Sequence, residues 1–202
     1  MQLQAVTIDE VRAILALTDN PHHHLLIEMF WITGGRCSEV LLLKPKQVGD
    51  SFIVMKNLKQ RTKVTVNGTV KVLKPHNAEK QVSVPLQFIG RLADYIKEYG
   101  VTPNQFVFSG LADRSRPYSR IHIYRIIKNA CERASVLKVN RYGKIVPAWP
   151  HCFRHGNATR LYEISHDIML VKEQLGHARV DTTQIYIEVN RESKQRSVEE
   201  AF

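Results

Sequence analysis

The stretch PHHHLLIEMFWITGGRCSEVLLL, Pro21 to Leu43, sets the pattern of the whole chain. Its first part is a largely apolar run that predicts a mostly buried helix. Gly34 and Gly35 end that helix, since glycine readily adopts the left-handed conformation that closes a helix. Arg36 follows directly, and SEVLLL then predicts a short second helix that ends near Pro45. The stretch therefore predicts a buried helical core that presents an arginine at a sharp turn.

Helical patterns continue on both sides of this stretch. Upstream, Thr7 and Glu10 have the spacing of a capping box, and the apolar residues after them predict a helix from Thr7 to about Leu17. Pro150 suits the first turn of a later helix, and Gly176 is expected to end another. The sequence downstream of residue 85 predicts helices in segments 86–100, 119–134, 149–163, 167–176 and 180–189.

A different pattern interrupts the helices between residues 51 and 85. SFIVM, TKVTV, TVKVL and KQVSVP are short runs of the kind that forms strands, and Asn67-Gly68 predicts a hairpin turn between two of them. The predicted fold class is therefore mainly α with a small antiparallel β-sheet insertion (α+β). We expect one domain over residues 1–190, with the β insertion at about 51–85, and a polar C-terminal tail at 191–202.

The composition indicates a globular domain with a polyanionic partner. The 202 residues include 29 Lys and Arg against 19 Asp and Glu, so the formal net charge is +10. This excess favours nucleic acid first and an anionic membrane second. No apolar run approaches the roughly 18 residues of a membrane span, and the N-terminus has no secretory signal. The three cysteines are widely spaced and support no disulfide framework, so we expect a cytoplasmic protein.

Several kinds of chemistry lack their motifs in this sequence. It has no GxxxxGK[ST] loop for ATP, no GxGxxG and no close group of carboxylates for a two-metal site. His22, His23 and His24 are consecutive, and side chains about 100° apart on a helix cannot all face one ion. We therefore expect no metal and no cofactor. Cleavage of nucleic acid by this chain would need a side-chain nucleophile and cations held in place by the fold.

Three motifs along the chain could supply those parts. TGGRCSEV places Arg36 after the glycine break, and HCFRH places His151 and Arg154 three residues apart on one helical face. LGHARVDTTQIY carries His177 and Tyr186. Each residue alone has a plainer explanation, such as a surface cap for the first arginine or core packing for the tyrosine. Their order and spacing together are harder to explain by packing alone.

In that order and spacing, the motifs resemble the TG-x-R-x-x-E, H-x-x-R-H and LGH…T-x-x-Y elements of the tyrosine recombinase (phage-type integrase) family. The resemblance spans roughly residues 7–189 and implies that family's catalytic-domain fold. Members usually carry an N-terminal helical domain that completes a clamp around DNA. The catalytic pattern starts here at Thr7, so we expect no N-terminal core-binding domain in this chain. The chain is then either a fragment or similar to the short single-domain members, such as fimbrial phase-variation invertases.

The resemblance implies a role in DNA cleavage for each matched residue. Arg36 and Arg154 would clamp the scissile phosphate, because a guanidinium offers a planar fork of donors that stays charged at any working pH. Tyr186 would attack phosphorus, with His151 as the base that takes the phenol proton. His177 would hydrogen-bond the phosphate.

Two further residues complete the implied site. Glu39 matches an acidic position that supports the active site from a second layer. The family also uses a lysine on a β-hairpin to protonate the 5′ oxygen that leaves. Lys59 fits best because it follows the strand SFIVM, while Lys56 and Lys63 are close alternatives and Lys80 is a further one.

The implied function is that of a site-specific recombinase or integrase, which cuts and rejoins DNA by transesterification through a 3′-phosphotyrosine, without metal or ATP. Double-stranded DNA is the implied partner, with a homotetramer on DNA and a monomer or weak oligomer when free. Integration, excision, inversion and dimer resolution share this chemistry, so the sequence does not separate them. Two alternatives stay open: a relaxing enzyme like the type IB topoisomerases, and a DNA-binding regulator that has lost catalysis.

Overall fold

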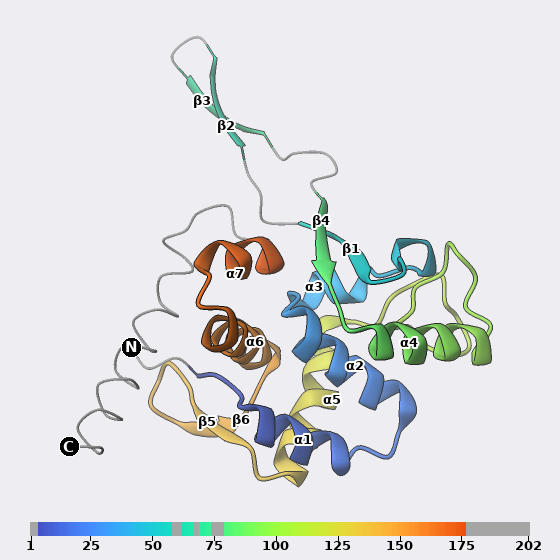
Figure 1. Ribbon diagram of the computed structural model, residues 1–202. Coiled ribbons are helices and arrows are strands. Elements are labelled where there is room, and N and C mark those ends of the chain that lie inside the picture. Colours follow the sequence, from blue (N-terminus) through green and yellow to red (C-terminus); the bar gives the residue numbers. More distant parts are fainter. Residues whose placement is uncertain (1–3, 58–61, 67–68, 74–78, 177–202) are drawn as a thin grey trace.

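The computed structural model describes residues 4–57, 62–66, 69–73 and 79–176. Within them the chain is mainly helical, with short antiparallel strand pairs, and the predicted fold class is confirmed (Figure 1). The helices are α1 (Ile8–Ala16), α2 (Pro21–Thr33), α3 (Cys37–Leu41), the 3-10 turn η1 (Pro45–Gln47), α4 (Leu86–Glu98), α5 (Arg120–Arg133), α6 (Pro150–Ser165) and α7 (Ile168–Leu175).

Helix α2 lies at the centre of the hydrophobic core, in contact with α1, α3 and α6. Leu26, Ile27, Met29 and Phe30 have no exposed surface, so α2 is buried around most of its circumference. Burial of each such side chain stabilises the fold by about 1.5–3 kcal/mol. The buried helix predicted from PHHHLLIEMFWIT is therefore confirmed, and it provides a rigid base for the turn that follows it.

The ends of the helices follow the predicted signals. Thr7 and Glu10 form both hydrogen bonds of the capping box at the start of α1. Pro150 occupies the first turn of α6. Gly34 and Gly176 close α2 and α7 with φ angles of 56° and 64°, in the left-handed region that favours glycine.

Four strands occupy the interval in which the sequence predicts a β insertion. They are β1 (Phe52–Lys56), β2 (Thr62–Val66), β3 (Thr69–Leu73) and β4 (Glu79–Ser83). Instead of one sheet, they form two separate antiparallel pairs, β1 with β4 and β2 with β3 (Figure 1). Val66 pairs with Thr69, as the hairpin signal predicts, although Asn67 and Gly68 themselves lie outside the described residues.

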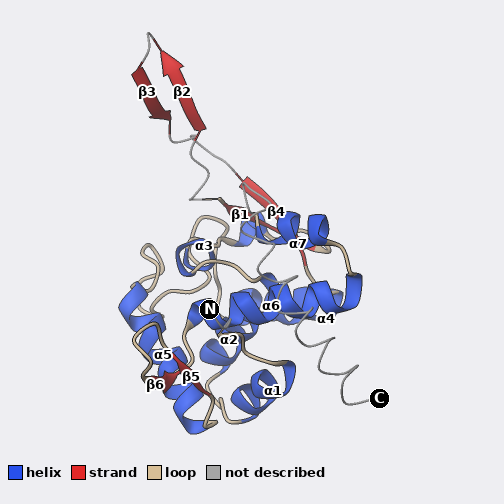
Figure 2. Ribbon diagram, turned by 90° about the vertical axis from the view of Figure 1, so that its left-hand side faces the viewer, coloured by secondary structure: helices blue, strands red, loops and turns tan. Residues whose placement is uncertain are grey.

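A third strand pair was missed by the sequence analysis. Strands β5 (Leu137–Val139) and β6 (Ile145–Pro147) form a hairpin between α5 and α6 (Figure 2). Each strand has only three residues, too few for a visible alternation, and the Asn140 side chain organises the turn by accepting from the backbone N–H groups of Tyr142 and Lys144. The hairpin leads the chain directly into α6.

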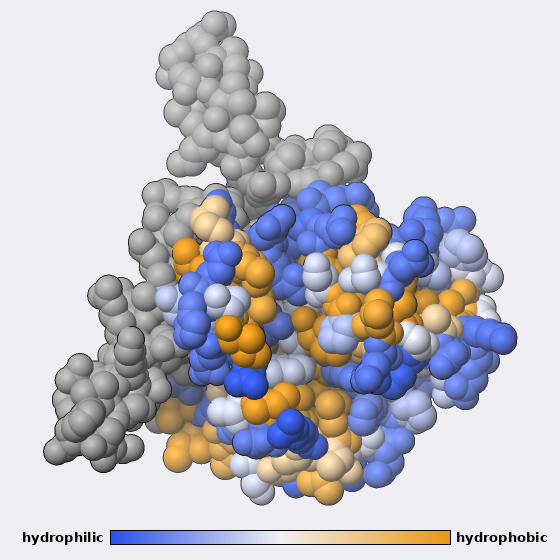
Figure 3. Space-filling view, in the orientation of Figure 1, coloured by the Kyte–Doolittle hydropathy of each residue, from blue (hydrophilic) through white to orange (hydrophobic). Residues whose placement is uncertain are grey.

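The described surface is of mixed character. In the view of Figure 3, hydrophilic residues surround smaller hydrophobic areas. Among the described residues, no helix is both long enough and apolar enough to cross a membrane.

Candidate active site

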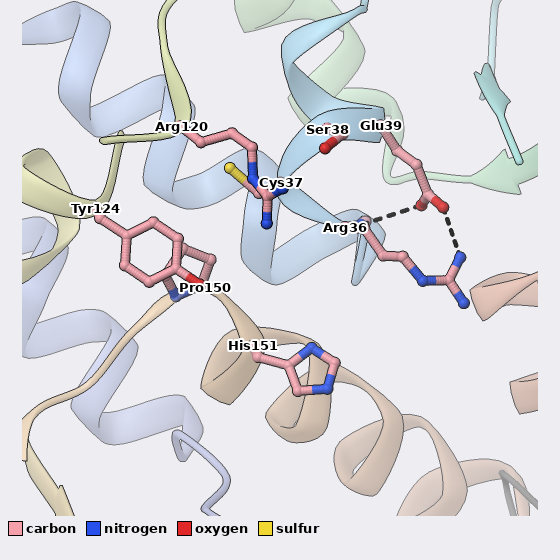
Figure 4. Close-up of a pocket in the computed structure, with 9 residues that line it drawn as sticks. Arg36, Cys37, Ser38, Glu39, Arg120, Tyr124, Pro150 and His151 are labelled. Carbon is pink, nitrogen blue, oxygen red and sulfur yellow. Dashed lines mark hydrogen bonds and ion pairs between the residues drawn. The ribbon is translucent and has the colours of Figure 1, made fainter. Parts of the chain in front are cut away.

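A cavity of about 240 Å³ opens where the turn before α3 meets the first turns of α5 and α6. Figure 4 shows its side chains converging from these three elements. Two of the residues predicted from separate motifs, Arg36 and His151, both line it, and the Arg36 side chain extends toward Glu39. The cavity is lined by Gly35, Arg36, Cys37, Ser38, Glu39, Arg120, Tyr124, Pro150 and His151.

Arg36 is held by Glu39, one turn further along the chain. The Arg36 guanidinium donates to Glu39 Oε1 at 2.5 Å, and the Arg36 backbone N–H donates to Glu39 Oε2 at 3.0 Å. Glu39 is only 1% exposed, whereas the arginine side chain keeps 19% of its surface exposed at the cavity. The carboxylate therefore orients the arginine from inside the protein and leaves its outer side accessible.

A lysine from β4 binds the other side of that carboxylate. Lys80 Nζ lies 3.2 Å from Glu39 Oε2 and donates to the Leu175 carbonyl oxygen at 3.1 Å. Burial lowers the pKa of Lys80 to about 8, although Glu39 partly opposes this effect. Burial alone would raise the pKa of Glu39, but Lys80 and Arg36 together outweigh it and hold that pKa below its ordinary value. Glu39 is thus a carboxylate held between two cations.

Arg154 joins the same network from α6. It is 2% exposed, and its guanidinium donates to the Gly34 carbonyl at 2.7 Å and to the Leu175 carbonyl at 3.0 Å. One of these carbonyls closes α2 just before Arg36, and the other ends α7. The Leu175 carbonyl accepts from both Arg154 and Lys80. Because Lys80 also contacts Glu39, which holds Arg36, the two motifs that carry arginines are connected through this carbonyl.

His151 lies in the first turn of α6 and is exposed at the cavity. Its ring packs edge-on against His155, with 4.5 Å between ring centroids. Burial lowers the pKa of His155 to about 4, helped by the nearby charges of His151 and Arg154. The partly buried second histidine of HCFRH is therefore neutral at pH 7, and its ring packs against the first.

The structure brings some predicted site residues together and does not describe others. Arg36, Glu39, His151 and Arg154 gather at the cavity and the network behind it. The predicted Lys59, His177 and Tyr186 lie outside the described residues. Helix α7 nevertheless ends at Leu175, in contact with Arg154, and His177 follows two residues later.

The three lysines that are alternatives to Lys59 lie at different places in the structure. Lys56 is exposed at the end of β1, and Lys63 lies in β2. Lys80 is in contact with Glu39. The assignment of Lys59 stays a prediction.

Six residues at the cavity carry no catalytic prediction from the sequence: Gly35, Cys37, Ser38, Arg120, Tyr124 and Pro150. Arg120 is exposed and belongs to the basic loop RSRPYSR, a candidate for phosphate contact on charge alone. Arg114 in the same loop is only 7% exposed and donates to the Val107 carbonyl at 3.4 Å, so it serves the fold instead. Charge patterning does not separate these two arginines, because burial depends on the tertiary fold.

Among residues 4–57, 62–66, 69–73 and 79–176, no group of three or more His, Cys, Asp or Glu side chains could hold a metal ion. The polar network described above is built from cations, one carboxylate and backbone carbonyls. Its chemistry suits the binding of an anion.

The comparison with protein families identifies the class. Residues 4–193 match the model of the phage integrase family, so the chain belongs to that family, and the resemblance to tyrosine recombinases is confirmed.

Individual relatives agree with this assignment. The chain is 28% identical over 197 residues to tyrosine recombinase XerD of Staphylococcus saprophyticus subsp. saprophyticus, covering 90% of this chain and 58% of that protein. It is 29% identical over 203 residues to tyrosine recombinase XerA of Pyrococcus horikoshii, covering 98% and 61%. The chain thus spans about 60% of the length of these curated relatives.

Solved structures show the same fold. A crystal structure of XerA recombinase superposes with a TM-score of 0.71 at 23% identity, covering 96% of this chain and 64% of that one. The catalytic domain of bacteriophage HP1 integrase gives a TM-score of 0.61 at 19% identity, covering 93% and 88%. The described fold therefore corresponds to the fold of the HP1 integrase catalytic domain over most of its length.

Proposed function

We propose that this chain is the catalytic domain of a site-specific DNA recombinase that cuts and rejoins strands by transesterification, without metal or ATP. The observation that carries the proposal is the joining of Arg36 and Arg154 through Glu39, Lys80 and the Leu175 carbonyl. Arg36 is thereby fixed at the cavity, where its guanidinium suits the non-bridging oxygens of a phosphodiester, and Arg154 is fixed in the network behind it.

In the proposed reaction, each step forms one phosphoester bond and breaks another. The Tyr186 phenol oxygen attacks phosphorus, and the bond from phosphorus to the 5′ oxygen breaks. His151 takes the phenol proton, which is needed because a phenol with a pKa near 10 is only about 0.1% ionised at neutral pH. The leaving 5′ oxygen receives a proton from a lysine, with Lys59 as the assigned donor. His177 hydrogen-bonds the same phosphate.

The product is a 3′-phosphotyrosyl link and a free 5′-hydroxyl. The link retains the energy of the broken bond, so a second 5′-hydroxyl can attack it and reseal the strand. This balance accounts for the lack of an ATP-binding motif in the sequence. The arginines stabilise the charge that develops on the phosphate, a contribution worth on the order of 10²–10³ in rate for each donor.

DNA is the proposed substrate and partner. The net charge of +10 favours a polyanion. A related XerH recombinase has been solved bound to its difH substrate, and a Tn1549 transposon integrase has been solved with transposon right end DNA. Recombination joins two duplexes, so we infer a homotetramer on DNA, and action on DNA would place the protein at the nucleoid.

Covalent trapping tests the reaction. The chain is incubated with nicked duplex fragments from the DNA that flanks its gene, in EDTA, and adducts are separated on a denaturing gel. We expect an adduct that Tyr186→Phe abolishes and that the control Tyr162→Phe, altered in α6 away from the cavity, retains.

Other outcomes contradict the proposal in different ways. An adduct that persists in Tyr186→Phe would refute the assigned nucleophile. An adduct that EDTA prevents would refute metal independence. Binding of these fragments with no adduct would favour the DNA-binding regulator.

A further inference from the structure

Lys80 links two parts of the site that are far apart in the sequence. Strand β4 alternates between exposed and buried positions, and Lys80 and Val82 occupy its buried positions. The Lys80 ammonium reaches Glu39 behind Arg36 on one side and the Leu175 carbonyl at the end of α7 on the other. Only 5% of the side chain is exposed. A buried lysine is costly unless it is paired and hydrogen-bonded, so both acceptors matter to it.

The end of α7 is fastened to the strand pair at several points. Asn57, just after β1, donates through its side chain to the Gly176 carbonyl at 3.1 Å. The Gln174 side chain accepts from the Ser83 backbone N–H at 3.1 Å and donates to the Ser83 carbonyl at 2.8 Å. These contacts and Lys80 together dock α7 on β4 (Figure 2).

The lysine stem fills the space that Gly176 leaves open. A Cβ atom at residue 176 would lie 2.6 Å from Lys80 Cδ, closer than real atoms approach. Glycine therefore serves two purposes here: it allows the left-handed turn that ends α7, and it admits the lysine stem. The backbone that leads to His177 starts from this contact.

We propose that Lys80 is a positioning residue, which fixes Arg36, Arg154 and the end of α7 as one unit, and that it does not protonate the leaving oxygen. Its ammonium is directed at Glu39 and the Leu175 carbonyl, both inside the protein. Loss of this cation would leave Glu39 with one cation in place of two and would remove one of the two donors to the Leu175 carbonyl. The proposal rests on the proposed function, because it assigns a role within that reaction.

A bridging-sulfur substrate separates positioning from proton donation. When sulfur replaces the 5′ oxygen at the scissile bond, the leaving thiolate needs no proton, because a thiol is a far stronger acid than an alcohol. A variant that lacks the acid regains its rate on this substrate, whereas a variant with a disturbed site does not. The readout is the rate of adduct formation on matched oxygen and sulfur duplexes.

We expect Lys80→Met to lose about 10²-fold in adduct formation on the oxygen substrate and to lose as much on the sulfur substrate. The control Lys97→Met, at an exposed position of α4, should match the unaltered chain on both. Rescue of Lys80→Met by sulfur would identify Lys80 as the acid and overturn the proposal. Adduct formation at the unaltered rate would overturn it as well.

Lys80→Arg provides a second comparison if the methionine variant does not fold. Arginine stays charged at any working pH and is too weak an acid to donate, yet it can bond to a carboxylate and a carbonyl. Positioning predicts that Lys80→Arg forms adduct on the oxygen substrate faster than Lys80→Met does. An acid role predicts instead that Lys80→Arg is inactive on oxygen and rescued by sulfur.

Hydrogen exchange in the free chain tests positioning without any reaction. We expect Lys80→Met to speed exchange at the amides of residues 36–40 and 174–176, with Lys97→Met unchanged, and to leave the centre of α2 protected. Unchanged exchange in both segments would overturn the proposal. If the unaltered chain forms no adduct, the proposed function fails, and this measurement still decides whether Lys80 holds the two segments together.

Discussion

His155 shows how one residue of a motif can act through its neighbours. Its imidazole is partly buried in α6 and packs against His151, and burial is the main reason that its pKa falls to about 4. In the unfolded chain its pKa is ordinary, near 6.5. Between these two pKa values, the unfolded chain binds a proton at His155 that the folded chain does not. The free energy of unfolding therefore falls as the pH falls.

A pH dependence of stability follows from His155. We expect the free energy of unfolding, measured with urea, to decrease from about pH 7 to about pH 5, because the unfolded state gains a proton in this window. His155→Gln should make this slope shallower without abolishing it, because burial also lowers the pKa values of His22 and His23, while His24→Gln in α2 should keep it. The same slope in both variants would show that His155 is not the group responsible.

The site residues differ in how readily the sequence reveals them. Arg36, Glu39, His151 and Arg154 lie in compact motifs whose order is informative, and the structure brings them to one place. Lys80 has no motif around it. The register of β4 on β1 decides whether the Lys80 side chain faces the interior. The sequence does not reveal this register, because a long insertion separates the two strands.

Among the elements, α6 is packed unusually closely against the N-terminal segment. The Val6 backbone N–H donates to the Cys152 carbonyl at 3.1 Å. A Cβ atom on Gly156 would lie 2.1 Å from the Val6 carbonyl oxygen and 2.7 Å from Trp31 Cζ3. Backbone forms one side of this contact, so a larger residue could be accommodated only if the segment moved away from α6.

Gly156→Ala is therefore expected to destabilise the fold by about 1–3 kcal/mol, the usual cost of overpacking. Gly90→Ala in α4 is the matched control, because a Cβ atom there meets nothing within 4 Å. The control should be neutral or up to about 1 kcal/mol more stable, since alanine favours helices more than glycine does. Urea unfolding of both variants checks this pair, and equal stabilities would refute the close contact.

Helices were more predictable than strands for a physical reason. The ends of α1, α2, α6 and α7 are set by local signals that lie within a few residues. The pairing of β1 with β4 joins residues on either side of the whole insertion, and no local signal encodes it. Prediction of a single sheet failed at this point, because strand spacing does not say which strands meet.

At the scale of the whole molecule, we expect charge to be the main determinant of the proposed DNA binding. The net charge of +10 implies that phosphate contacts supply much of the affinity. We expect the association constant for duplex DNA to fall steeply with salt, by on the order of 10³-fold over a fourfold rise in salt if about six phosphates are contacted. Fluorescence anisotropy with a labelled duplex measures this dependence.

Tyr186→Phe is the control for that experiment, because the change removes a neutral hydroxyl and no charge. It should bind with the same salt dependence as the unaltered chain. Binding that hardly changes with salt would mean that phosphate contacts are few.

The predicted fold class needed only local patterns, whereas the arrangement of charges over the surface depends on which segments meet, as in the ion pair of Arg133 with Asp19.

The Leu175 carbonyl has a consequence for the chain as it is made. It accepts from Lys80 and Arg154, and it lies late in the sequence. During synthesis both cations leave the ribosome before their common acceptor does. A nascent or truncated chain that stops short of residue 175 therefore carries its arginines without the contact that joins them. Under the proposed function, the two arginines are therefore joined only after α7 has been made and has docked.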